Sequence, residues 1–352
     1  MHADPTAKAA PSSTTADFVR RSLVRKGRWG VAEIAFWAVA AATLFFLPER
    51  HLILNEIAII GLFAVSLDLI LGYAGIVSLG HAAFFGLGAY AAGIVAKHGW
   101  TDPLLGLAIA AVAAAFLGFV TSFLVLRGTD LTKLMVTLGV ALLLGEVANQ
   151  ASWLTGGADG LQGITMGPVL GRFEFDIFGT TAYAYSLTVL FVLFVVARRI
   201  VVSPFGLSLR SIRDNPLRAR AVGIPVNHRL VAVYTLAAAY AGVAGGLLAQ
   251  TTQFVSLDVL AFHRSADIML VLVIGGVGYL YGGLLGAIGF KVLQDILSAW
   301  TPQYWQFWIG LILVVLVLVG RERLAGSIKS LRPRVQPAEQ AQALPATTAG
   351  EV

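Results

Sequence analysis

Long apolar runs separated by short polar stretches fill most of this chain. A helix of roughly 20 apolar residues crosses the hydrocarbon core of a bilayer, which is about 30 Å thick. We therefore predict an all-α polytopic membrane protein with about ten transmembrane helices. The predicted spans cover residues 31–47, 55–71, 81–97, 103–126, 131–153, 181–202, 229–252, 265–281, 284–300 and 304–320.

Basic residues predict the direction of these spans, because cytoplasmic loops of membrane proteins retain Lys and Arg. With ten crossings and the N-terminus inside, 20 of the 25 Lys and Arg fall in cytoplasmic segments. Both termini are therefore predicted to be cytoplasmic. The predicted domains are an N-terminal tail at 1–30, a transmembrane domain at 31–320 with a cytoplasmic loop at 203–228, and a disordered C-terminal tail at 321–352.

Composition narrows the classes of function. Of the 352 residues, 57% are hydrophobic and 12% charged, whereas a soluble domain carries about 25% charged residues. The net charge of +6 does not indicate nucleic-acid binding, because the basic residues lie between apolar runs. No Cys is present for a disulfide or thiolate site, and no Gly-Lys dipeptide for a phosphate-binding loop. We expect neither a catalytic residue, nor a metal site, nor a cofactor in the chain itself.

Small residues form a stripe along the third span. Ala82, Gly86, Ala89 and Gly93 recur at helical spacing and lie on one face of the predicted helix. Small side chains let membrane helices approach closely, so this face is predicted to pack against another helix.

A glycine-rich segment lies between residues 275 and 289. It includes Gly282, Gly286 and Gly289, which we predict to be helix-packing positions. Each Gly costs about 1 kcal/mol relative to Ala in a helix interior. We therefore predict a broken or re-entrant segment near 275–283, with a tight turn between two helices as the alternative.

Several ionisable groups fall inside predicted spans, where a central charge costs roughly 2.5–3.5 kcal/mol on insertion scales and needs a partner or water. Lys291 and Asp295 are four residues apart and can pair along one helix face. Glu146, Asn149 and Gln150 give the fifth span one polar face. That face either lines a path for a polar solute or ties helices together.

Asp68 and Asp267 lie near the middle of their spans and have no obvious local partner. As a proton relay they would indicate a secondary transporter. The alternative is that each carboxylate is bonded to a neighbouring helix.

The loop at 203–228 carries two helix-start signals, Ser203-Pro204 and Asn215-Pro216, and a stop at Gly223. Two short helices are therefore predicted. They either lie on anionic lipid through their arginines or form a docking surface for a cytoplasmic protein.

The segment Leu71–Tyr90, LGYAGIVSLGHAAFFGLGAY, resembles the signature of LivM-type permease subunits of branched-chain amino acid ABC importers. The similarity continues through residues 127–161, the loop at 203–228 and the late glycine-rich segment. It implies a second related permease, two cytoplasmic ATP-binding subunits and a periplasmic substrate-binding protein as partners, in a bacterial inner membrane. ATP would be bound by the partner subunits.

The resemblance also implies roles for particular positions. Those of the ATPase-coupling loop are Gly206, Arg210, Arg213, Asp214, Asn215 and Gly223. Those of the translocation path or family signature are Gly72, Gly75, Ser78, Gly80, His81, Gly86, Tyr90, Glu146 and Asn149.

Two positions depart from the family pattern, since Leu207 and Asn149 stand where arginines are common. Because Asn149 removes a charge from a face that could line the path, the expected cargo widens from branched-chain amino acids to related amides, urea or aromatic acids. The main alternative function is an ion-coupled secondary transporter that uses Asp68, Glu146 or Asp267.

Overall fold

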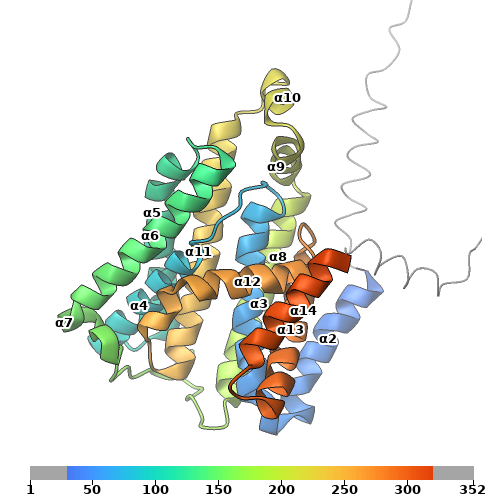
Figure 1. Cartoon of the computed structure of the whole chain (residues 1–352). Coiled ribbons are helices and arrows are strands. Elements are labelled where there is room, and N and C mark those ends of the chain that lie inside the picture. Colours follow the sequence, from blue (N-terminus) through green and yellow to red (C-terminus); the bar gives the residue numbers. More distant parts are fainter. Residues whose placement is uncertain (1–29, 320–352) are drawn as a thin grey trace, which may run out of the picture. The chain divides into compact units, whose positions relative to one another are not determined.

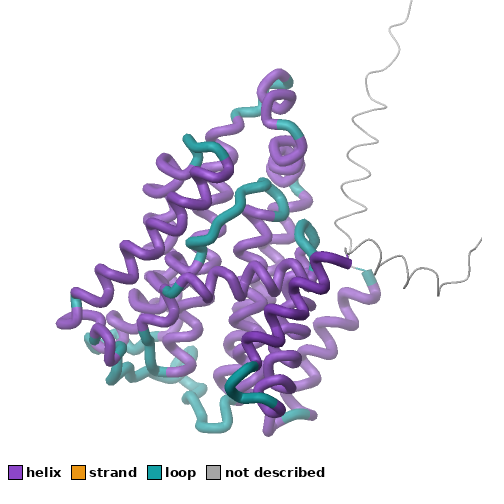
Figure 2. Tube along the Cα trace, viewed as in Figure 1, coloured by secondary structure: helices purple, strands orange, loops and turns teal. Residues whose placement is uncertain are grey.

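A computed structural model describes residues 30–319 of the chain. Over this range the chain is helical, with no strand beyond two isolated β-bridges (Figure 2). The α-helices, labelled in Figure 1, are α2 (Val31–Phe46), α3 (His51–Leu71), α4 (Ala82–Lys97), α5 (Pro103–Val125), α6 (Asp130–Gln150), α7 (Ser152–Thr155), α8 (Thr180–Val202), α9 (Pro204–Asp214), α10 (Pro216–Ala221), α11 (Val226–Thr252), α12 (Phe262–Gly275), α13 (Leu280–Trp300) and α14 (Trp305–Val319).

Each predicted span coincides with one of these helices, but the helices differ in length. Six segments of the described chain are long and apolar enough to cross a bilayer: Pro48–Leu71, α5, α6, α8, α11 and α13. The apolar helices α2 and α4 are shorter, and α12 has 14 residues. The fold is therefore that of a polytopic membrane protein, while the number of ten spans and their direction stay predictions. The predicted tails, apart from Gly30, lie outside the described residues.

Two compact units make up the chain, with the division between Leu293 and Gln294. The first unit holds α2 to α12 and most of α13. The second unit holds the end of α13 and the apolar helix α14.

Helix α11 is the centre of the first unit and packs against α3, α4 and α5. Its glycines allow the backbones to approach. A Cβ at Gly242 would lie 2.6 Å from the Ala110 carbonyl oxygen, and a Cβ at Gly245 would collide with the Phe85 carbonyl. Gly88 of α4 faces Gly242 with equally little space. Such packing holds helices together in lipid, where burial of apolar surface gives no driving force.

Helix α4 is too short to cross the bilayer alone. Its 16 residues extend about 24 Å, which is less than a hydrocarbon core of about 30 Å. The preceding segment, residues 72–81, is not helical, and most of it is buried. Non-helical backbone at membrane depth is tolerated only where protein or a water-filled cavity surrounds it. The helices around this segment therefore have to supply hydrogen-bond partners for its backbone N–H and C=O groups.

Helix α12 runs across the direction of α3 and α11 (Figure 1) and ends at the predicted break. It stops at Gly275, and α13 starts at Leu280. Gly276 and Gly278 between them have φ angles of 111° and 81°, which favour glycine. The connection is a tight turn, because a Cβ at Gly275 would collide with the carbonyl of Gly282 in α13.

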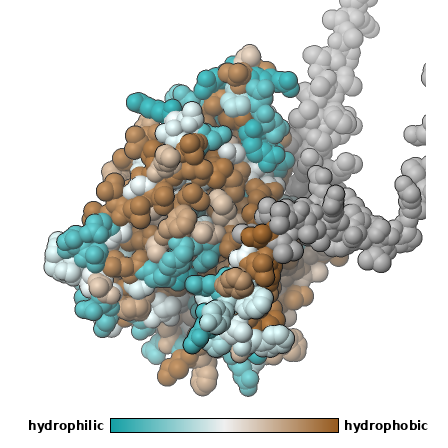
Figure 3. Space-filling model, viewed as in Figure 1, coloured by the Kyte–Doolittle hydropathy of each residue, from teal (hydrophilic) through white to brown (hydrophobic). Residues whose placement is uncertain are grey.

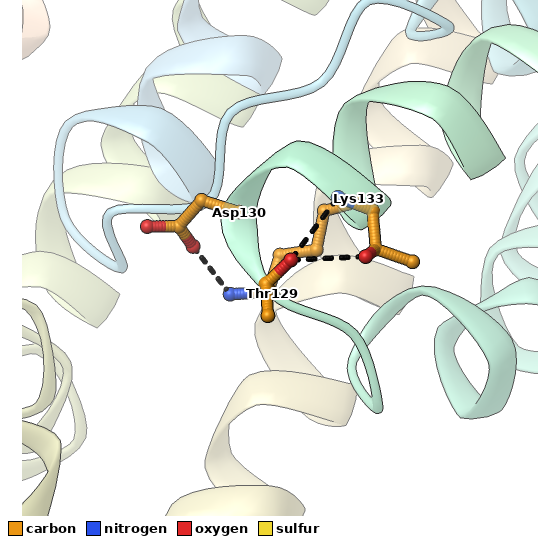
Figure 4. Close-up of polar contacts among 4 residues, drawn as sticks. Thr129, Asp130 and Lys133 are labelled. Atoms are coloured by element: carbon orange, nitrogen blue, oxygen red, sulfur yellow. Dashed lines mark hydrogen bonds and ion pairs between the residues drawn. The ribbon is translucent and has the colours of Figure 1, made fainter.

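Helix α6 begins with a local cap (Figure 4). The Thr132 N–H donates to Thr129 Oγ1 at 3.5 Å, and Asp130 pairs with Lys133 at 2.9 Å. A capping hydroxyl and an acidic first turn both suit a helix N-terminus.

Hydrophobic side chains cover the surface over α5 and α6, whereas hydrophilic ones gather at the end where α10 lies (Figure 3).

Candidate functional site

The loop at 203–228 forms two short helices, α9 and α10, as its helix-start signals predict. Asn215 Oδ1 accepts a hydrogen bond from the Arg218 N–H at 2.9 Å and caps α10. Gly223, with a φ of 88°, ends the turn that follows. Ser203 is the N-cap residue of α9, with Pro204 at the first helical position as predicted, but its hydroxyl makes no capping bond, because it donates to the Ile200 carbonyl at 2.6 Å. Such a bond to the preceding turn competes with capping.

Helix α9 is packed firmly against the rest of its chain. Leu209 is fully buried, and Ile212 packs with Ala219 of α10 and Val226 of α11. A Cβ at Gly206 would collide with the carbonyl of Val201, so the connection from α8 needs glycine. These contacts join α9, α10 and the start of α11 into one packed piece.

Both arginines of α9 contact the turn after α3. The Arg213 guanidinium donates a hydrogen bond to the Gly72 carbonyl, and the Arg210 guanidinium carbon lies 5.1 Å from the Tyr73 ring centroid. Gly75 has a φ of 73°, and a Cβ there would lie 2.8 Å from Arg213 Cγ. Because the guanidinium is planar and presents several donors, Arg213 fixes the path of this turn.

A buried carboxylate completes the cluster. Asp68 of α3 is 0% exposed, and its Oδ1 accepts a hydrogen bond from the Gly278 N–H at 2.7 Å. The charges of Arg213 and Arg210 attract this carboxylate. A Cβ at Gly72 would lie 2.5 Å from the Gly278 nitrogen. We refer to Asp68, Gly72, Arg213 and Gly278 as the polar node.

The polar node joins three elements that are distant in sequence: the end of α3, helix α9 and the turn between α12 and α13. Two of these are places where the helical backbone is interrupted. Asp68 is therefore bonded to neighbouring segments, which is one of the two alternatives that its position in the span left open. A backbone N–H and two cations offset part of the cost of placing this carboxylate in a span, although its Oδ2 is buried without a hydrogen-bond partner among the described residues.

The start of α4 is tied to two other helices by polar groups inside the bundle. The Ala82 N–H donates to Ser265 Oγ of α12 at 2.9 Å. His81 is 0% exposed, and its Nε2 lies 2.8 Å from Ser66 Oγ of α3. The His81 ring also stacks on Phe63, with ring centroids 5.5 Å apart. The segment 72–81 is thus fixed at both ends.

Other signature positions also face the interior. A Cβ at Gly80 would collide with the backbone of Thr137 in α6. The hydroxyls of Ser78 and Tyr90 are buried and have no hydrogen-bond partner within residues 30–319. A Cβ at Gly86 would lie 2.5 Å from Leu260 Cγ. Helix α4 therefore approaches its neighbours too closely for larger residues at its glycines.

Most of the small residues predicted as helix-packing positions have little space around them. Ala82 and Ala89 are fully buried, and a Cβ at Gly93 would lie 2.9 Å from Leu161 Cδ2. A Cβ at Gly286 would collide with the backbone of α12, as one at Gly282 would. At Gly289 the nearest neighbour of a Cβ would be 4.0 Å away, so this position has room for a side chain.

The polar face of α6 points away from the rest of the chain. Glu146, Asn149 and Gln150 are exposed, and Gln150 Nε2 donates to Glu146 Oε1 at 2.7 Å. The buried residues of α6, among them Ala141 and Ala148, lie on the opposite face. Within residues 30–319 this carboxylate has a hydrogen bond from Gln150 of the same helix and no ion pair.

Comparison with known proteins identifies the family. Residues 51–318 match the family model described as the permease component of the branched-chain amino acid transport system. The chain belongs to this family. It is 26% identical over 298 residues to the high-affinity branched-chain amino acid transport system permease protein LivM of Escherichia coli, covering 78% of this chain and 69% of that protein.

Permeases named for other cargoes are also similar to this chain. It is 29% identical over 254 residues to the autoinducer 2 import system permease protein LsrC of an Enterobacter species, covering 68% of this chain and 70% of that protein. It is 25% identical over 302 residues to the fructose import permease protein FrcC of Rhizobium meliloti, covering 81% of each. No solved structure matches the chain. The chain is thus a multi-pass permease component of an ABC transport system, and its family implies ATP-binding and substrate-binding partners.

Two ion pairs of the permease join residues of different helices. Lys291 of α13 pairs with Glu56 of α3, and Arg198 of α8 pairs with Glu33 of α2 at 2.9 Å. Local spacing suggested Asp295 as the partner of Lys291, and no sequence signal pointed to Glu56. Among the described residues, no group of His, Asp and Glu is placed to hold a metal ion.

Proposed function

We propose that this permease carries a small solute from the periplasm to the cytoplasm across a bacterial inner membrane, driven by ATP hydrolysis in separate subunits. The polar node supports this proposal. Through Arg213 and the Asp68–Gly278 bond, α9 is linked to both interruptions of the helical bundle. A displacement of α9 would therefore move the end of α3 and the α12–α13 turn together.

The surface that would receive such a force is α10. Leu217 is 75% exposed and Val222 76% exposed, and Arg218 and Arg220 beside them are exposed. Exposed apolar anchors within a charged rim are typical of protein interfaces. We assign α10 to docking of the ATP-binding subunits. The arginines of α9, which the resemblance implied for that contact, are assigned to transmission within the chain.

The route of the solute is proposed to follow the exposed face of α6. Glu146 lies four residues, about 6 Å, before the end of α6 at Gln150, and Trp153 follows in α7. Trp favours the membrane interface, so Glu146 would lie within the hydrocarbon region. A carboxylate facing lipid there would cost roughly 2.5–3.5 kcal/mol. A second permease subunit that covers this face, with a polar path between the two, removes that cost.

The cargo is proposed to be a branched-chain amino acid or a related amide, urea or aromatic acid. The relatives are permeases for branched-chain amino acids, autoinducer 2 and fructose, which are chemically different solutes. We infer that a periplasmic binding protein makes the main selection, and that this chain supplies the route.

The test is uptake by proteoliposomes that contain this permease, a second permease subunit and the ATP-binding subunits, with the binding protein added outside. We expect uptake of labelled leucine or one of the related solutes to require ATP. Uptake by this chain alone under a proton gradient, without ATP-binding subunits, would contradict the proposal and favour an ion-coupled carrier.

A docking variant tests the role of α10. The double substitution Leu217→Glu and Val222→Glu places two carboxylates on the proposed contact. We expect the ATP-binding subunits to be lost from the purified complex, while the second permease is retained. Phe178→Glu is the matched control, since this 78% exposed apolar side chain lies at the opposite end of α8. Retention of the ATP-binding subunits by the double variant would refute the assignment.

A further inference from the structure

A long apolar groove separates α5 from α8. It has a volume of about 730 Å³, and its walls come mainly from α5 and α8, with Val243 of α11 as part of its floor. The lining runs along α8 from Thr180 to Leu193, which is about 20 Å of helix. This exceeds the depth of one leaflet, since half of a typical hydrocarbon core is about 15 Å.

Polar contacts with α11 hold the groove open. Gln250 of α11 accepts a hydrogen bond from the Tyr185 hydroxyl of α8 at 3.1 Å and donates to the Pro103 carbonyl of α5 at 2.7 Å. Further along α8, the Tyr240 hydroxyl donates to the Leu193 carbonyl at 3.0 Å. Each flanking helix is thus tied to α11, and the space between them is a built feature of the fold.

Water and polar solutes do not suit this space. Its walls present almost no polar surface, and apolar cavities do not hold water stably. Since α5 and α8 are both long and apolar enough to cross a bilayer, the groove opens beside lipid chains. An acyl chain matches both its chemistry and its length.

A free cation lies at the mouth of the groove. The loop residues Leu170 and Phe173 line its end nearest the start of α8, and Arg172 between them is exposed and forms no ion pair with the described residues. Of the two carboxylates nearest to it along the chain, Asp176 accepts hydrogen bonds from the α8 backbone, and the exposed Glu174 forms no ion pair with the described residues. Arg172 is therefore available to a phosphate.

We propose that this groove binds one glycerophospholipid, with an acyl chain between α5 and α8 and its phosphate at Arg172. The lipid comes from the leaflet opposite α9 and α10, because α8 leads from this mouth directly to α9. The inference needs only that α5 and α8 cross the membrane. It therefore stands or fails separately from the proposed transport function.

Native mass spectrometry of the full chain with added palmitoyl-oleoyl phosphatidylglycerol tests the groove. We expect one lipid to stay bound to the wild type after the others have been stripped. Ala184→Phe, which fills the groove from α8, should lower this occupancy at least about tenfold. Val112→Phe is the matched control on α5, because Val112 is 68% exposed and does not line the groove; its occupancy should equal that of the wild type.

The phosphate contact is tested with a second probe, a diacylglycerol that has the same chains and no phosphate. Arg172→Ala should weaken retention of phosphatidylglycerol about threefold to tenfold and leave retention of the diacylglycerol unchanged. Lys97→Ala, which removes another exposed cation, should change neither. Equal loss of both probes in Arg172→Ala would overturn the role of this residue.

Two further outcomes would overturn the lipid proposal. Unchanged phosphatidylglycerol occupancy in Ala184→Phe would show that the lipid binds elsewhere. Loss of a co-purified second permease in that variant, with lipid retained, would show that a protein helix occupies the groove. If Ala184→Phe elutes as an aggregate in size-exclusion chromatography, Ala108→Phe fills the groove from the α5 side at an exposed position and carries the same expectations.

Discussion

Helices α11 and α6 are both long and apolar, yet they differ in where they find their partners. In the most apolar stretch of α11, 67% of the residues are buried inside the chain, against 17% for α6. Their glycines show the same contrast. A Cβ at Gly245 of α11 would collide with the backbone of α4, whereas Cβ atoms at Gly139 and Gly145 of α6 would meet nothing. Helix α11 thus finds its packing partners within the described part of this chain. Most of the surface of α6 is not covered by that part of the chain.

The largest expected effect comes from a substitution that disrupts the packing of α11 within the chain. Gly245→Leu forces a side chain into the Phe85 carbonyl, and overpacking typically costs about 1–3 kcal/mol, occasionally more where, as here, the clash is with backbone. We expect the full chain to lose its folded, monodisperse peak in fluorescence-detected size-exclusion chromatography.

The matched control is Gly139→Leu on α6, where a side chain has open space. This variant should fold like the wild type when the chain is expressed alone. It should reduce co-purification of the second permease if α6 forms the contact between them. Equal damage by both substitutions would remove the contrast between the two helices.

The next effect concerns α9, which resembles α11 in being held inside the chain. A hydrogen bond from a charged donor contributes about 1.5–3 kcal/mol, so Arg213→Ala should lower uptake about 10- to 100-fold. The ATP-binding subunits should remain bound and continue to hydrolyse ATP, since α10 is unchanged. Arg199→Ala, an exposed arginine of α8, serves as the control and should transport normally. Loss of the ATP-binding subunits from Arg213→Ala would place this residue in docking instead of transmission.

A smaller effect is expected on the uncovered face of α6. Glu146→Leu removes the carboxylate and its hydrogen bond with Gln150, and uptake should fall about threefold to tenfold without loss of assembly. Glu146→Gln keeps a hydrogen-bonding group and should retain more activity. If Glu146 faced lipid, Glu146→Leu would instead raise the yield of folded chain and leave uptake unchanged, because it would remove a charge from the hydrocarbon region.

Features that depend on local sequence were predictable. Apolar runs mark the positions of the helices, and the glycines after Gly275 mark the break, because backbone preference is a property of neighbouring residues. Asn215 and Pro216 similarly indicate the start of α10. The resemblance, carried by the signature segment at 71–90, pointed to the family that the comparisons then showed.

Contacts between distant segments were not predictable. The Arg213–Gly72 and Asp68–Gly278 bonds join residues 141 and 210 positions apart, and no spacing rule reaches that far. The resemblance implied that the arginines of α9 contact the ATP-binding subunits, and the charge pattern alone left anionic lipid or a docking protein open as their partner. The carbonyl exposed where α3 ends supplies the missing acceptor.

The smallest expected effect concerns Asp176 in the loop before α8. Its carboxylate accepts hydrogen bonds from the N–H groups at the start of that helix. Partial burial raises the pKa of Asp176, but hydrogen bonds from the Thr181 and Thr180 N–H groups outweigh it and hold the pKa below the ordinary 3.8. The stabilisation is therefore present above pH 3.8 and is lost as the pH falls through the lower folded value. Asp176→Ala should cost about 1 kcal/mol, as for a typical N-terminal cap, and less where solvent screens the charge. The thermal midpoint of the variant should lie below that of the wild type at pH 7, and this gap should close as the pH falls through the folded pKa of Asp176, which is below 3.8. Asp159→Ala, an exposed loop carboxylate, should show no difference across this titration. A gap for Asp176→Ala that stays constant across it would show that the carboxylate charge is not what holds this end of α8.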